Sequence, residues 1–340
     1  MLIMKLWIIR ACWGVLAIIV LTTMVGVVYE IAARNRAVRD FPPPGKLVDI
    51  GGRRIQIDCR GSGSPTVVFE SGLDIYGSLS WSTVHDEIAK TTRACAYSRA
   101  GIMWSDPNEA PQSGKAIADD LHATLRKAGE SKPFVLVGHS LGGPYIMTYT
   151  KYFGADVAGL VFVDAAHPDQ KQRLDAVAKI EESKLIAFRD KVGVLLNWTG
   201  VVRAVVATYQ NMPNQPESVH QTMKAYASTS FGPMLKESQA LAQTLAEAGT
   251  FRQLVNRPIL VLTAMAPIPE QVRVNLGWTK AQAKQFQDGW KQLHDEQATW
   301  SSRSQHQLIP DASHYIQFDR PDIVIAAVQS VVASVRAQRK

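Results

Sequence analysis

The segment Gly138-His139-Ser140-Leu141-Gly142 matches the pattern G-x-S-x-G, in which a serine stands at the apex of a sharp turn. The pattern is informative only between a strand and a helix. Here an apolar run at 134–137 precedes it, and a segment of helical spacing follows from residue 143. Glycines are needed because a side chain beside so tight a turn would clash with neighbouring backbone. The pattern predicts that Ser140 is a nucleophile for a carbonyl carbon, and the alternative is an unreactive serine in a turn.

Short apolar segments alternate with segments of helical spacing around this motif. We expect strands at 46–50, 54–59, 66–70, 93–97, 134–137, 157–163, 258–262 and 307–309, and helices at 81–90, 117–128, 143–152 and 323–335. This alternation predicts an α/β fold with a mostly parallel sheet and helices on both faces. Its core would comprise residues 46–169 and 251–340. Residues 170–250 have a helical pattern without a convincing strand, so we expect them to form a lid over the site.

Several segments, taken in order, resemble the α/β-hydrolase superfamily and are nearest to its proline-iminopeptidase-like and esterase-like branch. They are Val68-Phe69-Glu70-Ser71-Gly72-Leu73, Tyr97-Ser98-Arg99-Ala100-Gly101, the turn at 138–143, and Pro310-Asp311-Ala312-Ser313-His314. The resemblance begins near residue 46 and is weakest through the lid. It implies the α/β-hydrolase fold and an oxyanion hole made by the backbone N–H groups of Leu73 and Leu141. Ser71 replaces the histidine usual before this glycine, and backbone donors do not depend on that side chain.

His314 is the expected base for Ser140. It follows the last expected strand and precedes the closing helix, where the family's histidine lies. The chain has eight histidines. His139 lies inside the turn and is expected to face away from the oxyanion site, whereas His85, His122 and His220 fall in helical stretches and are interpreted as surface or core residues.

The acid that should orient His314 departs from the family's usual place. The strand at 258–262 is followed by no carboxylate until Glu270, beyond Pro267 and Pro269. Asp164 ends the strand at 157–163, and neighbouring parallel strands bring their carboxyl ends to one edge of the sheet. This arrangement resembles pancreatic-type lipases. We expect Asp164 to be the acid, with Glu270 as the alternative and with a turn-capping role for Asp164 also open.

Residues 11–29 carry no charged side chain and, at ~1.5 Å per residue, nearly span a hydrocarbon core of ~30 Å. They predict a single-pass membrane anchor at 1–33 that contacts the lipid bilayer through residues 11–29. A cleaved signal peptide is the alternative, although the run ends in a poor cleavage site. Residues 34–45 contain Pro42-Pro43-Pro44, which predicts a stiff, extended stalk.

The net charge of +7 favours lipid headgroups over nucleic acid, because basic residues cluster directly after the apolar run and no nucleic-acid motif is present. The clustered residues are Arg34, Arg36, Arg39, Lys46, Arg53 and Arg54. The basic residues that flank the anchor do not favour a cytoplasmic N-terminus. Before the anchor stand Lys5 and Arg10, and after it stand Arg34, Arg36 and Arg39.

Cys59 and Cys95 fall on strands that should be neighbours in the sheet. A cross-strand disulfide is possible if their Cα atoms approach to ~5.5 Å, and two buried thiols are the alternative. A disulfide would place the catalytic domain in an oxidising compartment outside the cytoplasm, against the orientation that the flanking charges suggest. Cys12 lies in the anchor.

The expected function is that of a membrane-anchored serine hydrolase that cleaves an ester or related acyl bond of a small molecule through an acyl-enzyme. Amide or carbon–carbon bond cleavage by the same groups, and a non-catalytic tethered binding protein, remain open. A serine nucleophile argues against the dehalogenase and epoxide-hydrolase branches, which use aspartate. No cofactor or metal is expected, and the sequence does not indicate an oligomeric state. Aromatic and methionine residues of the lid would line an apolar pocket or pack between helices: Trp198, Tyr209, Met212, Tyr226 and Phe231.

Overall fold

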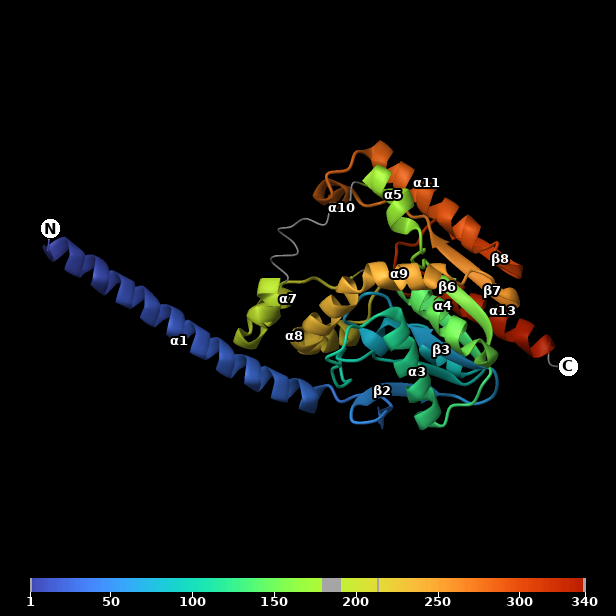
Figure 1. The fold of residues 1–340 in the computed structure, drawn as a ribbon, viewed down its shortest axis with the longest axis horizontal. Helices are drawn as coiled ribbons and strands as arrows, with labels where there is room; N and C mark the ends of the chain where they lie inside the picture. The colour runs from blue at the N-terminus through green and yellow to red at the C-terminus, as the bar shows by residue number, and fades with distance from the viewer. Residues whose placement is uncertain (1, 179–190, 213, 339–340) are drawn as a thin grey trace.

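The computed structural model describes residues 2–178, 191–212 and 214–338, and its described chain is built around one eight-stranded sheet (Figure 1). The strand order is β1-β2-β4-β3-β5-β6-β7-β8. β1 pairs with β2, and β2 with β4, in antiparallel fashion, and all other neighbouring pairs are parallel. The strands are β1 (Lys46–Asp49), β2 (Arg54–Arg60), β3 (Thr66–Glu70), β4 (Ala94–Tyr97), β5 (Phe134–His139), β6 (Val157–Val163), β7 (Val255–Ala264) and β8 (Ser301–Ile309).

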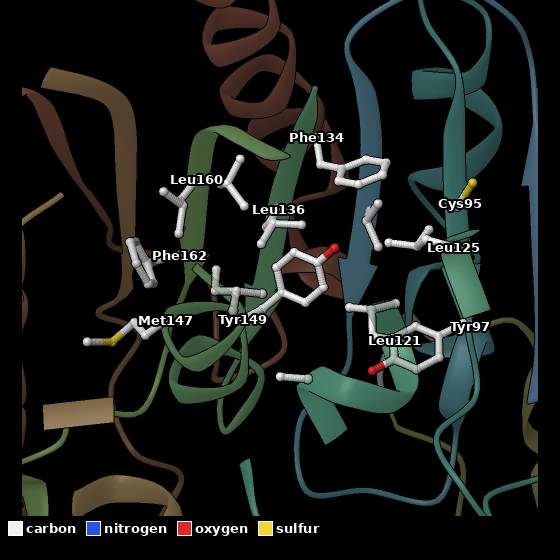
Figure 2. Packing of buried hydrophobic residues seen from close by; sticks show 14 of the residues in the cluster. Cys95, Tyr97, Leu121, Leu125, Phe134, Leu136, Met147, Tyr149, Leu160 and Phe162 are labelled. Carbon is white, nitrogen blue, oxygen red and sulfur yellow. The ribbon is translucent and has the colours of Figure 1, made fainter. Parts of the chain in front are cut away.

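Helices cover both faces of the sheet and bury it in two apolar layers. On one face Leu136 packs with Leu121 and Tyr149, which come from α3 (Gly114–Ala128) and α4 (Gly142–Phe153) (Figure 2). On the other face the alternate residue Val135 packs with Ile88 of α2 (His85–Ala89) and Val328 of α13 (Pro321–Ala337). Burial on both sides explains why β5 and β6 are nearly continuous apolar runs. The fold is therefore the α/β-hydrolase fold that the sequence predicts.

The structure extends the expected elements at the far edge of the sheet. β8 begins at Ser301, whereas the sequence predicts a strand only at 307–309. It is an edge strand with many exposed polar residues, so it lacks the apolar pattern of the inner strands. Between β7 and β8 lie α10 (Glu270–Asn275) and α11 (Lys280–Gln297), which the sequence analysis did not predict. The short α12 (Ile316–Asp319) precedes α13.

The insertion at 170–250 is helical in its described part, but its helices pack against different parts of the structure. α5 (Gln170–Ala178) packs against α11, and α9 (Leu241–Gly249) packs on α3 and α4. A further layer contains the 3-10 turn η3 (Asn197–Thr199), α7 (Val201–Ala207) and α8 (Glu217–Gln239). Residues 179–190 of the predicted lid lie outside the described residues.

The N-terminal helix α1 (Leu2–Asp40) projects from the body and is long and apolar enough to cross a membrane (Figure 1). It continues past the predicted boundary at residue 33, so residues 34–40 are helical and only 41–45 remain as a connection to β1. The extended stalk predicted over 34–45 is wrong for its helical part, because tertiary contacts hold that part. Ala37 is buried, and the Tyr226 hydroxyl of α8 donates to the carbonyl oxygen of Ala37 over 3.3 Å.

Candidate active site

Ser140 lies in the turn between β5 and α4, with a positive φ of 52°. Few residues other than glycine adopt this conformation, and it is typical of strained functional positions. Hydrogen bonds on both sides hold the turn. The Ser140 N–H donates to the carbonyl of Val163 (3.2 Å), and the Ala166 N–H donates to the carbonyl of Ser140 (2.7 Å). The ends of β5 and β6 therefore fix this backbone together.

The glycines around Ser140 are required by close backbone contacts. A Cβ on Gly138 would lie 2.6 Å from the carbonyl oxygen of Gly142, and one on Gly142 would lie 2.5 Å from that of Glu70. A Cβ on Gly143 would meet the Cβ of Ala165 at 2.5 Å. These distances give the physical reason for glycine on both sides of the serine, as the sequence analysis expects.

His314 follows β8 and is brought to Asp164, which follows β6. Its Nδ1 lies 2.6 Å from Oδ2 of Asp164. The other carboxylate oxygen, Oδ1, accepts hydrogen bonds from the Ala264 N–H and the Trp290 indole, each over 2.9 Å. Burial raises the pKa of Asp164, but the hydrogen bond and charge of His314 outweigh it, so the pKa lies below its ordinary value. The buried group is therefore an ionised acceptor that holds the imidazole in one orientation.

His139 is buried and supports the loop of His314. Its Nε2–H donates to the carbonyl oxygen of His314 over 2.9 Å, and the two rings lie 4.7 Å apart. Burial, reinforced by the charge of His314, lowers the pKa of His139 to about 3, so the ring is a neutral donor. His139 thus links the serine turn to the histidine loop, a role that the sequence analysis did not predict.

The two predicted oxyanion donors stand at the start of α4 and after β3. Leu141 is buried in an apolar cluster, and the partly buried Leu73 packs against the same cluster. Among the residues that the structure describes, neither N–H has a hydrogen-bond partner. The neighbouring Gly72 adjoins the nucleophile, because a Cβ there would lie 2.9 Å from the Cβ of Ser140. The segment that leads to Leu73 therefore lies next to Ser140.

Arg99 fixes the backbone that leads to Leu73. Its guanidinium is buried and donates to the carbonyl oxygens of Ser71 (2.8 Å) and Gly72 (2.6 Å). It also pairs with Glu70 (2.7 Å) and with Glu237 of α8 (2.8 Å), so one cation joins the core to the lid. In the sequence, Arg99 is distinguished only as part of a segment that resembles the α/β-hydrolase superfamily. Its partners Glu70 and Glu237 are distant in the sequence, so no short motif predicts these ion pairs.

Other predicted site residues lie elsewhere. Glu270 begins α10, where its side chain is 81% exposed and pairs with Arg273, so it is not brought to His314. Trp198 and Tyr209 are exposed on the outer side of the lid, and Tyr226 packs on Trp104. The apolar pocket that these residues were expected to line is therefore not formed by them. Met212 and Phe231 pack in the apolar cluster beneath the lid, as the alternative expected.

The structure joins Cys59 and Cys95 in a disulfide between β2 and β4. The two residues are direct partners in the register, and their Cα atoms lie 4.0 Å apart. The antiparallel pairing of these strands thus accounts for the proximity that the sequence analysis expects.

A second cluster contains the ligand types of a metal site. His167, Asp169 and Glu296 bring their ligand atoms close together beneath α5 and α11. However, Arg252 donates to Asp169 (2.6 Å) and to Glu296 (3.0 Å) and so supplies the positive charge that these carboxylates need. The arrangement is that of an ion-pair network.

Residues 47–327 match the alpha/beta hydrolase family. A probable transporter, efuK, of Hormonema carpetanum is 28% identical over 320 residues, which are 86% of this chain but only 43% of that protein. The fold is similar to that of a thermophilic esterase of Thermogutta terrifontis, with a TM-score of 0.57 and 18% identity over 85% of this chain and 98% of the esterase. It is also similar to that of a putative epoxide hydrolase of Pseudomonas aeruginosa, with a TM-score of 0.58 and 20% identity over 86% of this chain and 96% of that one.

At these identities the solved structures establish the fold, and the matched segment covers the strands and helices that carry Ser140, Asp164 and His314. The fold, the serine turn and this match agree, and the chain belongs to the alpha/beta hydrolase family.

Proposed function

We propose that the chain is a membrane-anchored serine hydrolase that cleaves an ester or related acyl bond, with Ser140 as nucleophile, His314 as base and Asp164 as acid. The observation that carries the proposal is the 2.6 Å contact between His314 Nδ1 and Asp164 Oδ2, at the edge of the sheet where the turn presents Ser140. A buried carboxylate that orients a histidine beside a strained serine is the arrangement that activates a hydroxyl for acyl transfer.

In the proposed acylation step, Ser140 Oγ forms a bond with the substrate carbonyl carbon while its proton passes to Nε2 of His314. The carbonyl oxygen becomes an oxyanion that accepts hydrogen bonds from the N–H groups of Leu73 and Leu141. The bond from carbon to the leaving oxygen then breaks, and that oxygen takes the proton from His314. Asp164 stabilises the charged imidazole and remains ionised throughout.

In the proposed deacylation step, a water molecule gives a proton to His314 and its oxygen attacks the carbonyl carbon of the acyl-enzyme. The same two amides stabilise the second oxyanion. The bond to Ser140 Oγ then breaks, and His314 returns the proton to that oxygen. The products are a carboxylic acid and the alcohol released earlier.

Labelling with a fluorescent alkyl fluorophosphonate tests the nucleophile. The wild-type chain should be labelled and should hydrolyse p-nitrophenyl acetate, and Ser140→Ala should lose both activities. Ser302→Ala, which removes an exposed hydroxyl on β8, is the matched control and should retain both. Absence of labelling in folded wild type would leave the non-catalytic binding protein as the better explanation. Comparing matched ester, thioester and anilide substrates would then identify the bond cleaved.

Helix α1 is proposed to remain on the mature chain as its membrane anchor. Glu30 is buried and pairs with Arg203 over 2.8 Å, so removal of residues 1–33 would leave a buried arginine without its carboxylate. The disulfide favours placing the catalytic domain outside the cytoplasm. Intact mass of the membrane-extracted protein tests retention of α1, and protease digestion of sealed cells tests the side of the membrane.

A further inference from the structure

The outer edge of the lid, residues 194–209, exposes apolar side chains and almost no charge. Leu195 is 70% exposed and Trp198 is 52% exposed. Arg203 is the one charged residue in this stretch of sequence, and it is buried. The exposed large apolar side chains of this lid edge are Val194, Leu195, Leu196, Trp198, Val201, Val205 and Tyr209. Such a patch on one short segment is typical of an interaction surface.

The lid edge lies directly against α1, and two glycines allow the contact. A Cβ on Gly26 would lie 2.3 Å from the carbonyl oxygen of Thr199, and a Cβ on Gly200 would lie 3.2 Å from that of Gly26. Figure 1 shows α7 and α8 beside the part of α1 that approaches the body. The patch is therefore continuous with the apolar surface of α1.

A buried ion pair fixes this arrangement. Arg203 Nε donates to Oε2 of Glu30 (2.8 Å), and its Nη2 donates to the hydroxyl of Ser228 (2.8 Å). Ser228 in turn donates to Oε1 of Glu30 over 2.6 Å. Separating the lid edge from α1 would leave the buried Arg203 without its carboxylate and Glu30 with only the partly exposed Arg34 as its cation, which is unfavourable. The lid edge and α1 thus behave as one surface.

The contact lies at the depth of the membrane interface. The uncharged run at 11–29 would cross the hydrocarbon core, and Gly26 and Glu30 lie in and just after its last turn. Tryptophan and tyrosine are enriched at that depth because their rings are apolar and their N–H or O–H groups reach water. Trp198 and Tyr209 are residues of this kind, and both are exposed on the lid edge.

We infer that the lid edge is seated in the interface of the same bilayer leaflet from which α1 emerges. Its inner side packs on Ile75 and Tyr76, which closely follow the proposed oxyanion residue Leu73. The lipid surface thus borders the lid wall of the site. Resting on the proposed function, the inference extends to substrate class: acyl esters with long chains that dissolve in the membrane.

Spin-label accessibility of the full chain in phosphatidylcholine–phosphatidylglycerol vesicles tests the seating. In a Cys12→Ser background, a nitroxide is placed at Leu195→Cys, at Ile18→Cys within α1, and at Val274→Cys. Val274 is a matched control because it is 59% exposed on α10, away from the lid edge. Labels at 18 and 195 should collide more with dissolved oxygen than with a water-soluble nickel chelate, and the label at 274 should show the reverse.

A label at 195 that is as accessible to the nickel chelate as the label at 274 overturns the inference. So does a label at 195 that is shielded from both reagents and broadened by a second spin, because a second copy of the chain would then cover the patch. An aqueous signal at position 18 overturns it as well, since α1 would not be in the bilayer.

Kinetics test the substrate class. Leu195→Glu should lower hydrolysis of a long-chain p-nitrophenyl ester in vesicles several-fold, while fluorophosphonate labelling and p-nitrophenyl acetate hydrolysis stay unchanged, and Val274→Glu should alter none of these. Unchanged long-chain hydrolysis in Leu195→Glu overturns the substrate assignment. Loss of wild-type labelling while the label at 195 still reports lipid overturns the proposed function and leaves the seating intact, so the two failures are distinguishable.

Discussion

His314 Nδ1 and Asp164 Oδ2 lie 2.6 Å apart although 150 residues separate them in the chain. The contact arises because β6, β7 and β8 are parallel neighbours that end at the same edge of the sheet, so the residues that follow β6 and β8 meet there. Asp164 has a positive φ of 41°, and its other oxygen is held by Ala264 and Trp290. The carboxylate is thus bound to β7 and α11 independently of the histidine.

Replacing Asp164 by asparagine should lower kcat for ester hydrolysis roughly 10³–10⁴-fold, because the amide no longer stabilises the imidazolium and can select the wrong tautomer. The substitution preserves size and keeps an oxygen available for Trp290 and Ala264. KM should change little, since Asp164 would not contact substrate. Steady-state kinetics with p-nitrophenyl acetate measures the loss.

Glu270→Gln is the control for this prediction, since Glu270 is the other carboxylate that sequence reasoning considered. It is exposed on α10, and its replacement should leave kcat unchanged. A near-normal rate for Asp164→Asn, or a large loss for Glu270→Gln, would contradict the assignment of the acid.

Arg99→Lys should lower kcat more than it raises KM. Lysine keeps the charge but cannot donate at once to Gly72, Ser71 and the two carboxylates, so the backbone before Leu73 would lose its support. Arg99→Ala should in addition destabilise the fold by about 3–5 kcal/mol, because it leaves two buried carboxylates without a cation. Urea unfolding and kinetics of the lysine variant separate positioning from stability, and a lysine variant with normal kcat would contradict the positioning role.

Because the pKa of Glu70 is raised in the folded chain, the free energy of unfolding should fall as pH rises. Burial raises the pKa of Glu70 to about 7, against the opposing charge of Arg99. Between its ordinary pKa and this value the folded chain binds a proton that the unfolded chain has released. The free energy of unfolding should therefore decrease with rising pH in this window, by up to about 1.4 kcal/mol per pH unit.

Glu70→Gln tests this linkage, because glutamine does not titrate. Denaturant unfolding gives the free energy of unfolding of wild type and variant across the same pH window. The difference between the two free energies should narrow as pH falls toward the ordinary pKa of a glutamate. Parallel pH profiles for the two proteins would show that Glu70 titrates normally.

The core of the fold could be predicted from sequence because its signals are local. The G-x-S-x-G pattern and the apolar run of β5 are each recognised within a few residues, although Gly142 and Gly143 are required by contacts with the distant Glu70 and Ala165. The approach of Asp164 to the histidine loop follows from strand order, once parallel neighbours are assumed. Each inference needed only a short window of sequence and one rule of sheet geometry.

The contacts of α1 could not be predicted in this way. Glu30 and Arg203 are 173 residues apart, and neither position carries a pattern that identifies its partner. Helix α11 is different, since Thr279 and Gln282 form a capping box that marks its start. That signal predicts the start of the helix that carries Trp290, whose indole donates to Asp164, but it does not identify this contact.

Breaking the Cys59–Cys95 disulfide should destabilise the catalytic domain without changing its chemistry. The disulfide spans 36 residues, and loss of a constraint of this kind commonly lowers stability by about 2–4 kcal/mol. Both residues lie on β2 and β4, toward the edge of the sheet away from β6, which ends in Asp164. Cys59→Ser/Cys95→Ser should therefore keep kcat while its midpoint of urea unfolding falls.

Dithiothreitol should lower the midpoint of urea unfolding of wild type to a similar value and leave that of the double variant unchanged. Cys12→Ser is the control, and its midpoint should still fall with dithiothreitol. If the reductant shifts neither wild type nor Cys12→Ser, the two thiols are not bridged, and the support for an oxidising compartment is lost.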